Sequence, residues 1–121
     1  MSERDFRLYF SDILDSGAAI QEFVKGLSFE EFCKDRKVYS AVIREFEVIG
    51  EAVGKCLEEL KRKVPNVEWQ DIKDFRNLLI HEYFGVDLEI VWRTVQDDLP
   101  VLMDAVTEIL RVESDSSVDG R

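Results

Sequence analysis

The sequence predicts an all-α protein, an up-and-down helical bundle of four main helices and one short helix. Apolar residues recur at helical spacing along most of the chain. Two prolines and six glycines are too few for the many tight turns of a β-sandwich. No stretch alternates between apolar and polar residues as a half-buried strand does. With 121 residues the chain is expected to form one domain with its own core.

The first two helices follow from periodicity and from a capping pattern. An amphipathic stripe covers residues 6–24 and is expected to end near Gly26. Ser28 is followed three residues later by Glu31, which is the capping-box pattern that begins a helix. A short second helix is therefore expected from Ser28 onward.

The third and fourth helices are separated by a proline. An apolar stripe runs through residues 37–61, and Pro65 stops it because proline cannot continue the hydrogen-bond ladder. A fourth helix is predicted over residues 69–83, with Gly85 placed to end it as a C-terminal cap.

The last helix is predicted over residues 88–111, with Asp87 as its N-cap. Pro100 lies inside this pattern and is expected to kink the helix or split it in two. Residues 113–121 are polar and acidic and are expected to be a disordered tail. The expected domain is therefore residues 1–112.

Composition excludes several classes of protein. With 16 basic and 26 acidic residues the net charge is −10, which disfavours DNA and anionic membranes as partners. Residues 61–84 are the one long stretch that is not acidic, so a polyanion would bind there. Cys33 and Cys56 form neither a disulfide framework nor a zinc site. No apolar run reaches membrane-spanning length, so a soluble, cytoplasmic protein is expected.

The candidate chemistry lies at the end of the fourth predicted helix. His81 is the only histidine of the chain, so proton transfer near neutral pH falls most naturally to it. On a helical wheel Arg76 and Tyr83 are about 20° apart, and Asn77 and His81 about 40° apart. A guanidinium, an amide, an imidazole and a phenol bordering one face are typical of phosphate chemistry.

Structural explanations compete with this interpretation. Arg76 could belong to an interhelical polar cluster, paired with Glu45 or Glu51. Glu45, Glu47 and Glu51 favour a solvated acidic face, although a divalent ion there remains an alternative. Zinc-protease, P-loop and di-iron patterns are absent from the sequence, so no metal ligand is assigned.

The motif and its flanks resemble a known family. Arg76, His81 and Tyr83 have the spacing R-x4-H-x-Y, which resembles the motif of HEPN-domain proteins of the HepT toxin type. Three further blocks are similar to that family, in the same order along the chain: residues 42–52, residues 65–69, and residues 83–87 together with Val91 and Trp92. The resemblance covers roughly residues 4–111.

The resemblance implies a metal-independent endoribonuclease, the toxin of a type VII-like toxin–antitoxin pair. It implies a homodimer that brings two motifs to one cleft, and an RNA substrate such as mRNA or tRNA. The implied roles are general acid or base for His81, charge stabilisation for Arg76, and orientation of His81 or of the phosphate for Asn77. The antitoxin would be a minimal nucleotidyltransferase that adds AMP to Tyr83. No cofactor is implied.

Two alternatives remain at this point. The chain could be a non-nucleolytic subunit that binds a substrate or nucleotide for a nucleotidyltransferase, or an inert helical dimerisation module. The acidic net charge favours these alternatives, whereas the intact set of Arg76, His81 and Tyr83 favours the nuclease.

Overall fold

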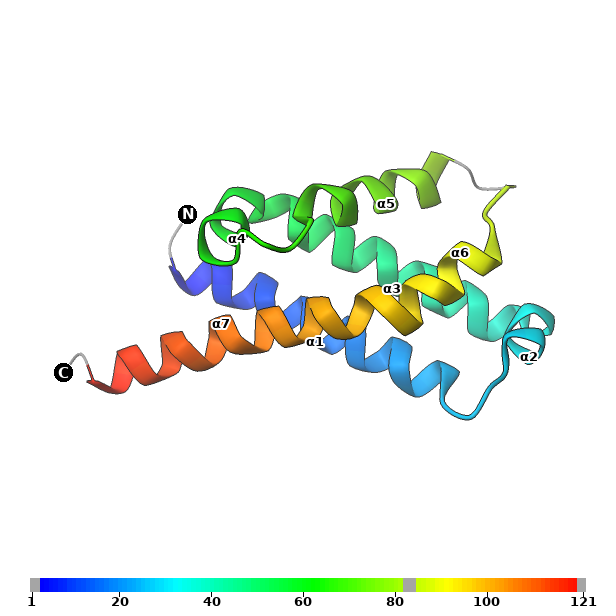
Figure 1. The fold of residues 1–121 in the computed structure, drawn as a ribbon, viewed down its shortest axis with the longest axis horizontal. Helices are drawn as coiled ribbons and strands as arrows, with labels where there is room; N and C mark the ends of the chain where they lie inside the picture. Colours follow the sequence, from blue (N-terminus) through cyan, green and yellow to red (C-terminus); the bar gives the residue numbers. More distant parts are fainter. Residues whose placement is uncertain (1–2, 82–84, 120–121) are drawn as a thin grey trace.

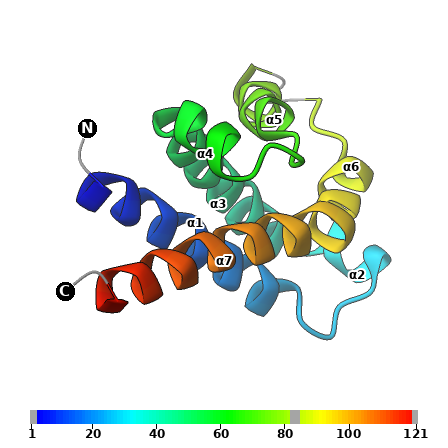
Figure 2. The same cartoon turned by 60° about the vertical axis from the view of Figure 1, so that its left-hand side comes forward.

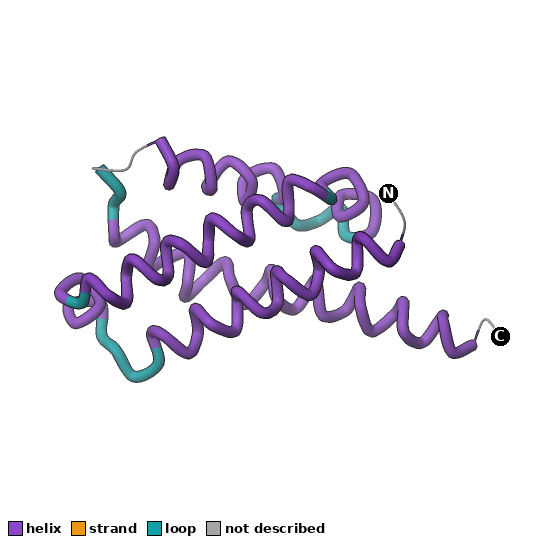
Figure 3. Tube along the Cα trace, turned by 180° about the vertical axis from the view of Figure 1, so that it is seen from behind, coloured by secondary structure: helices purple, strands orange, loops and turns teal. Residues whose placement is uncertain are grey.

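The computed structural model describes residues 3–81 and 85–119, and it leaves undescribed the side chains of residues 3–4, 77–78, 80–81 and 113–119. Within the described residues every regular element is a helix and none is a strand (Figure 3). The predicted all-α class is confirmed.

Four long helices alternate in direction along the bundle (Figure 1). They are α1 (Glu3–Val24), α3 (Arg36–Lys55), α5 (Trp69–His81) and α7 (Leu99–Asp119). Helix α3 packs against both α1 and α5, while α7 packs along α1. Helix α1 begins and α7 ends at the same end of the bundle (Figures 1 and 2). The short helices are α2 (Phe29–Lys34), α4 (Leu57–Lys63) and α6 (Leu88–Arg93).

The first connection follows the sequence prediction closely. Gly26 ends α1 with a positive φ of 79°, a conformation that glycine adopts without strain. Ser28 then begins α2 with a complete capping box. The Glu31 amide donates to Ser28 Oγ (3.1 Å), and the Ser28 amide donates to Glu31 Oε1 (2.9 Å). The backbone hydrogen bond from Ser28 lowers the pKa of the Glu31 carboxyl.

The third predicted helix is wrong in one respect, because it is broken at Cys56 into α3 and α4. The Cys56 backbone leaves the helical region (φ −128°, ψ 29°). Its thiol donates to the Ala52 carbonyl (3.2 Å), the acceptor that its own amide would use in a regular helix. The Cys56 amide donates instead to Val53 O (3.2 Å), which tightens the chain. Cys56 at the bend and Leu60 after it are both buried, with exposed fractions of 2% and 0%.

The last predicted helix is split before Pro100, as expected. A π-helical turn at Thr94–Asp98 separates α6 from α7, and the Leu99 amide donates to Thr94 O. The buried residues Val91, Val95 and Leu99 are spaced four apart twice in succession. In a regular α-helix two such steps would rotate the apolar stripe by about 80°. The wider π turn absorbs this rotation and keeps the three side chains on the core.

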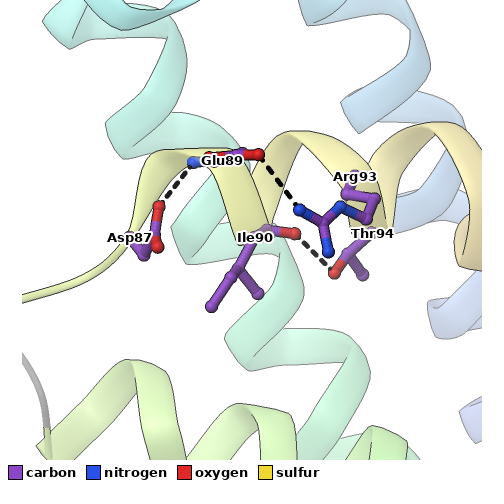
Figure 4. A network of polar contacts seen from close by, with 5 residues as sticks. All are labelled: Asp87, Glu89, Ile90, Arg93 and Thr94. Carbon is purple, nitrogen blue, oxygen red and sulfur yellow. Dashed lines mark hydrogen bonds and ion pairs between the residues drawn. The ribbon is translucent and has the colours of Figure 1, made fainter.

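The start of α6 is fixed by side-chain hydrogen bonds (Figure 4). Asp87 Oδ1 accepts a hydrogen bond from the Glu89 amide (2.9 Å), which confirms Asp87 as the N-cap. Arg93 pairs with Glu89 across one turn (3.1 Å), and Thr94 Oγ1 donates to Ile90 O (2.8 Å). The predicted cap at Gly85 depends on residues 82–84, which lie outside the described residues.

Helix α7 extends to Asp119, beyond the expected end near Arg111. The disordered tail that the sequence predicts over residues 113–121 stays a prediction. After Pro100 the chain has no proline or glycine before Gly120, so nothing in the backbone stops the helix earlier. None of the helices formed by the described residues has the length and apolar character needed to span a membrane.

Candidate active site

Helix α5, which carries the predicted motif, is anchored at its first residue. Trp69 is 1% exposed, and its indole Nε1 donates to the Val64 carbonyl (2.8 Å). This bond ties the start of α5 to the end of α4 across the turn that contains Pro65. Because α5 begins at a fixed point, its register against α3 is fixed as well.

Helices α3 and α5 approach very closely at Arg76. A Cβ atom built on Gly50 would lie 2.2 Å from Arg76 Cβ and 2.8 Å from its Cγ, far inside any normal contact. Glycine is therefore required at position 50 for Arg76 to occupy its place. Arg76 is partly buried, and its Nε atom is shielded from solvent. The guanidinium is thus attached to a stem that the α3–α5 contact holds in place.

One helical turn away the same contact is repeated in a looser form. A Cβ on Gly54 would lie 3.5 Å from Lys73 Cε, an ordinary van der Waals distance. As the α3 residue number rises from 50 to 54, the α5 partner falls from 76 to 73, so the two helices are antiparallel. Arg76 and Lys73 therefore lie in one row along this contact, which we call the α3–α5 seam.

Another stripe of α5 lies about 100° around the helix from the seam. Gln70 and Asp74 are exposed on this side, and Gln70 Nε2 donates to Asp74 Oδ1 (3.0 Å). Positions 77 and 81 continue the same stripe at helical spacing, so the backbone places Asn77 and His81 in line with Gln70 and Asp74. We call positions 70, 74, 77 and 81 the outer stripe of α5.

The predicted site residues are thus placed to different degrees. Arg76 lies on the seam with α3. Asn77 is in the third turn of α5 and His81 is its last residue, but the side chains of both lie outside the described residues. Tyr83 belongs to residues 82–84, which also lie outside them. Whether Arg76, Asn77, His81 and Tyr83 come together therefore stays a prediction.

The described part of the chain offers no cluster of three or more Asp, Glu, His or Cys side chains that could hold a metal ion. On α3, where the sequence left a divalent ion as an alternative, Glu47 is paired with Arg44 (3.6 Å). Cys56 is buried beneath α4, and burial, with the nearby Glu59 carboxylate, raises the pKa of its thiol to about 12. This thiol is neutral and unreactive at physiological pH.

Sequence reasoning missed one feature near α5, a cavity of about 400 Å³. Its floor is apolar and includes Phe46 and Phe75, whose rings meet edge to face with their centroids 5.3 Å apart. Its polar lining comes from three carboxylates and two neutral side chains, namely Glu68, Asp71, Asp98, Asn66 and Thr94. Arg76 does not line it. No local sequence signal reveals the cavity, because its walls come from α3, α5, the π turn and α7.

The chain thus folds into an all-helical domain in which one helix, α5, carries both Arg76 and His81. The family model for HepT-like proteins, described as Ribonuclease HepT-like, matches residues 13–109, and the chain belongs to this family.

Relatives support the same assignment. The chain is 43% identical over 107 residues to "Putative RNase TTE0752" of Caldanaerobacter subterraneus, covering 88% of this chain and 96% of the relative. It is 40% identical over 100 residues to "Probable ribonuclease HepT" of Thermococcus cleftensis, covering 83% and 91%. It is 39% identical over 106 residues to "Putative RNase MJ1380" of Methanocaldococcus jannaschii, covering 88% and 97%. No solved structure matches the chain.

Proposed function

We propose that this protein is a metal-independent endoribonuclease, the toxin of a type VII-like toxin–antitoxin pair. Family membership and the ribonuclease names of its relatives support RNA cleavage as the reaction. The observation that carries the proposal is the close packing of Arg76 against Gly50. Arg76 precedes His81, the only histidine of the chain, by five residues. An arginine whose stem is held by packing loses less side-chain entropy when its guanidinium binds a phosphate.

In the proposed reaction the ribose 2′-hydroxyl attacks the adjacent phosphorus. The bond from O2′ to phosphorus forms, and the bond from phosphorus to O5′ breaks, leaving a 2′,3′-cyclic phosphate and a 5′-hydroxyl. One proton leaves O2′ and one is delivered to O5′, and His81 is the group for one of these transfers. Arg76 stabilises the charge that develops on the phosphoryl oxygens, and Asn77 orients His81 or the phosphate.

The active unit in this proposal is a homodimer. Arg76 and His81 are about 140° apart around α5 and about 7.5 Å apart along it. Arg76 lies on the seam, whereas position 81 belongs to the outer stripe. A two-fold symmetric cleft bordered by the outer stripe and the adjoining seam of each protomer would present two histidines and two arginines to one RNA strand.

Silencing is proposed to occur at Tyr83. A minimal nucleotidyltransferase would transfer AMP from ATP to the phenol oxygen and release pyrophosphate. Tyr83 follows Arg76 by seven residues, so we propose that the attached AMP brings a phosphate into competition for the same guanidinium. RNA, such as mRNA or tRNA, and the antitoxin are the proposed partners, and a cytoplasmic location accompanies them.

The decisive experiment is RNA cleavage by the purified full-length protein and by its His81→Ala variant. Loss of general acid–base catalysis lowers the rate by about 10²–10⁴-fold, so cleavage should disappear while the circular dichroism spectrum is unchanged. Arg76→Ala should lose a comparable factor. Arg76→Lys should recover little, because an ammonium group cannot fork onto two oxygens. Cleavage that persists in His81→Ala, or that is abolished by excess EDTA, would contradict this mechanism.

A second candidate is a non-nucleolytic subunit that binds a substrate or nucleotide for the nucleotidyltransferase. The net charge of −10 favours it, because RNA-binding surfaces are usually basic. Purified protein that binds a nucleotide stoichiometrically and leaves every RNA tested intact would favour this candidate over the nuclease.

A further inference from the structure

Lys73 lies one helical turn before Arg76 on the same seam, in a looser contact. Its aliphatic stem crosses Gly54, where a built Cβ would meet Cε at 3.5 Å, Cδ at 3.7 Å and Cγ at 3.8 Å. The whole length of the side chain is thus laid along the α3–α5 seam. Lys73 is partly buried and forms no ion pair or hydrogen bond with any residue that the structure describes.

The two contacts form a regular pattern. Gly50 and Gly54 are one turn apart on α3, and Arg76 and Lys73 are one turn apart on the antiparallel α5. The row therefore carries two cations about 4.5 Å apart along the α5 axis. The tight packing at Gly50 restricts the Arg76 stem, so part of the side-chain entropy that binding would cost at Arg76 is already lost in the free protein.

The cationic side chains of α4 differ from Lys73 because each is paired with a carboxylate of its own helix. On α4, Arg62 and Lys63 both pair with Glu59, and Lys61 pairs with Glu58. Their charges are compensated within the helix itself. Lys73 carries an ammonium without such an internal carboxylate among the described residues, in a chain with ten more acidic than basic residues. A polyanion approaching Arg76 would meet this charge next.

We infer that Lys73 binds the RNA phosphodiester that neighbours the one held by Arg76. This inference rests on the proposed function and extends it by adding a second phosphate subsite on the seam. Contacts to phosphate carry no sequence information, so this subsite sets the affinity and the register of the strand rather than the cleavage sequence.

A purely structural role for Lys73 makes a different prediction. Lysine stems often cover apolar surface and leave only the charged head in water, so Lys73 could serve simply to cover Gly54. Lys73→Met separates the two roles, because methionine keeps an unbranched stem and removes the charge. Under the structural role Lys73→Met would change neither RNA affinity nor its dependence on salt.

The test measures binding of a fluorescent single-stranded RNA to the full-length protein in a His81→Ala background, over a series of salt concentrations. One lost phosphate contact should reduce the slope of log K against log salt by about 0.7. Lys73→Met should show this reduction, and Lys73→Arg should retain the original slope. Lys25→Met is the matched control, since it removes one charge at an exposed position after α1.

Kinetics on proteins with His81 intact provide the second readout. Lys73→Met should raise KM several-fold with little change in kcat, because the phosphate it contacts is not the one that reacts. An unchanged slope in Lys73→Met, or an equal reduction in Lys25→Met, would overturn the subsite while leaving the nuclease proposal standing. Failure of the wild type to bind or cleave RNA would instead overturn the proposed function, and this inference with it.

Discussion

The backbone of Gly50 packs directly against the side-chain stem of Arg76 and leaves no space for another atom. A Cβ on Gly50 would be 2.2 Å from Arg76 Cβ and 3.4 Å from its Cα. Gly50→Ala must therefore push α5 away from α3. We expect a loss of about 1–3 kcal/mol in the free energy of unfolding, as for other overpacked contacts, together with reduced RNA cleavage. Chemical denaturation and the cleavage assay measure the two effects.

Gly54→Ala is the internal control for this prediction. The added methyl would lie at an ordinary 3.5 Å from Lys73 Cε, and alanine is favoured over glycine in a helix by up to ~1 kcal/mol. This variant should be as stable as the wild type or more stable. Equal destabilisation by both alanines would show that the tight contact between Gly50 and Arg76 is not the cause.

The outer stripe of α5 predicts the dimer. Sedimentation at micromolar concentration should give twice the 14.1 kDa of one chain. Asp74→Arg should weaken the dimer, because it places two new cations near the two-fold axis and removes the bond from Gln70. Asp12→Arg changes the charge equally at an exposed position on α1 and should leave the dimer intact. A wild-type protein that sediments only at 14.1 kDa would end the idea of a shared cleft.

Tyr83 is the predicted point of control. Tyr83→Phe should cleave RNA like the wild type yet resist silencing by a nucleotidyltransferase and ATP, because the accepting phenol oxygen is missing. Intact-protein mass spectrometry gives the result directly. An increase of one or more AMP units on Tyr83→Phe would place the modification on another residue.

Cys56 should make the stability of the protein depend on pH in the alkaline range. Its raised pKa, about 12, means that the folded protein holds the thiol neutral while the unfolded chain begins to ionise near 8.5. The stability this provides is complete below about pH 8.5 and is lost as the pH rises towards 12. Cys56→Ala should flatten that part of the stability profile.

A thiol-reagent experiment compares Cys56 with Cys33. At pH 8 the partly buried Cys33 should react with a disulfide reagent in the native protein, and Cys56 only after denaturation. Two fast-reacting thiols in the native state would mean that the bend between α3 and α4 opens readily.

Local signals in the sequence predicted most of the helices. The Ser28 capping box, the Asp87 cap and the split before Pro100 depend on residues within one or two turns, so a single sequence is enough to find them. The break at Cys56 was missed because the apolar stripe continues through it. A thiol that takes over a backbone acceptor leaves no mark in composition or periodicity.

In the candidate site, too, local features could be predicted from the sequence and long-range contacts could not. The positions of Arg76, Asn77 and His81 on one helix follow from spacing alone. The close packing of Arg76 against Gly50 does not follow from spacing. In the sequence alone, Gly50 is only a residue that disfavours a helix, and its role is visible once α5 is packed against α3. Contacts between residues 26 positions apart depend on how two helices pack, which no local pattern specifies.

The π turn at Thr94–Asp98 has a consequence for how this chain tolerates change. Three of its residues, Gln96, Asp97 and Asp98, are exposed, so substitutions there touch little. The π turn holds one residue more than an α-turn, so removing a single residue here would convert the bond from Leu99 to Thr94 into an ordinary α-helical bond and leave α7 aligned with α6. The segment should therefore tolerate both replacements and the loss of one residue, so natural variants are expected to include single deletions at this point.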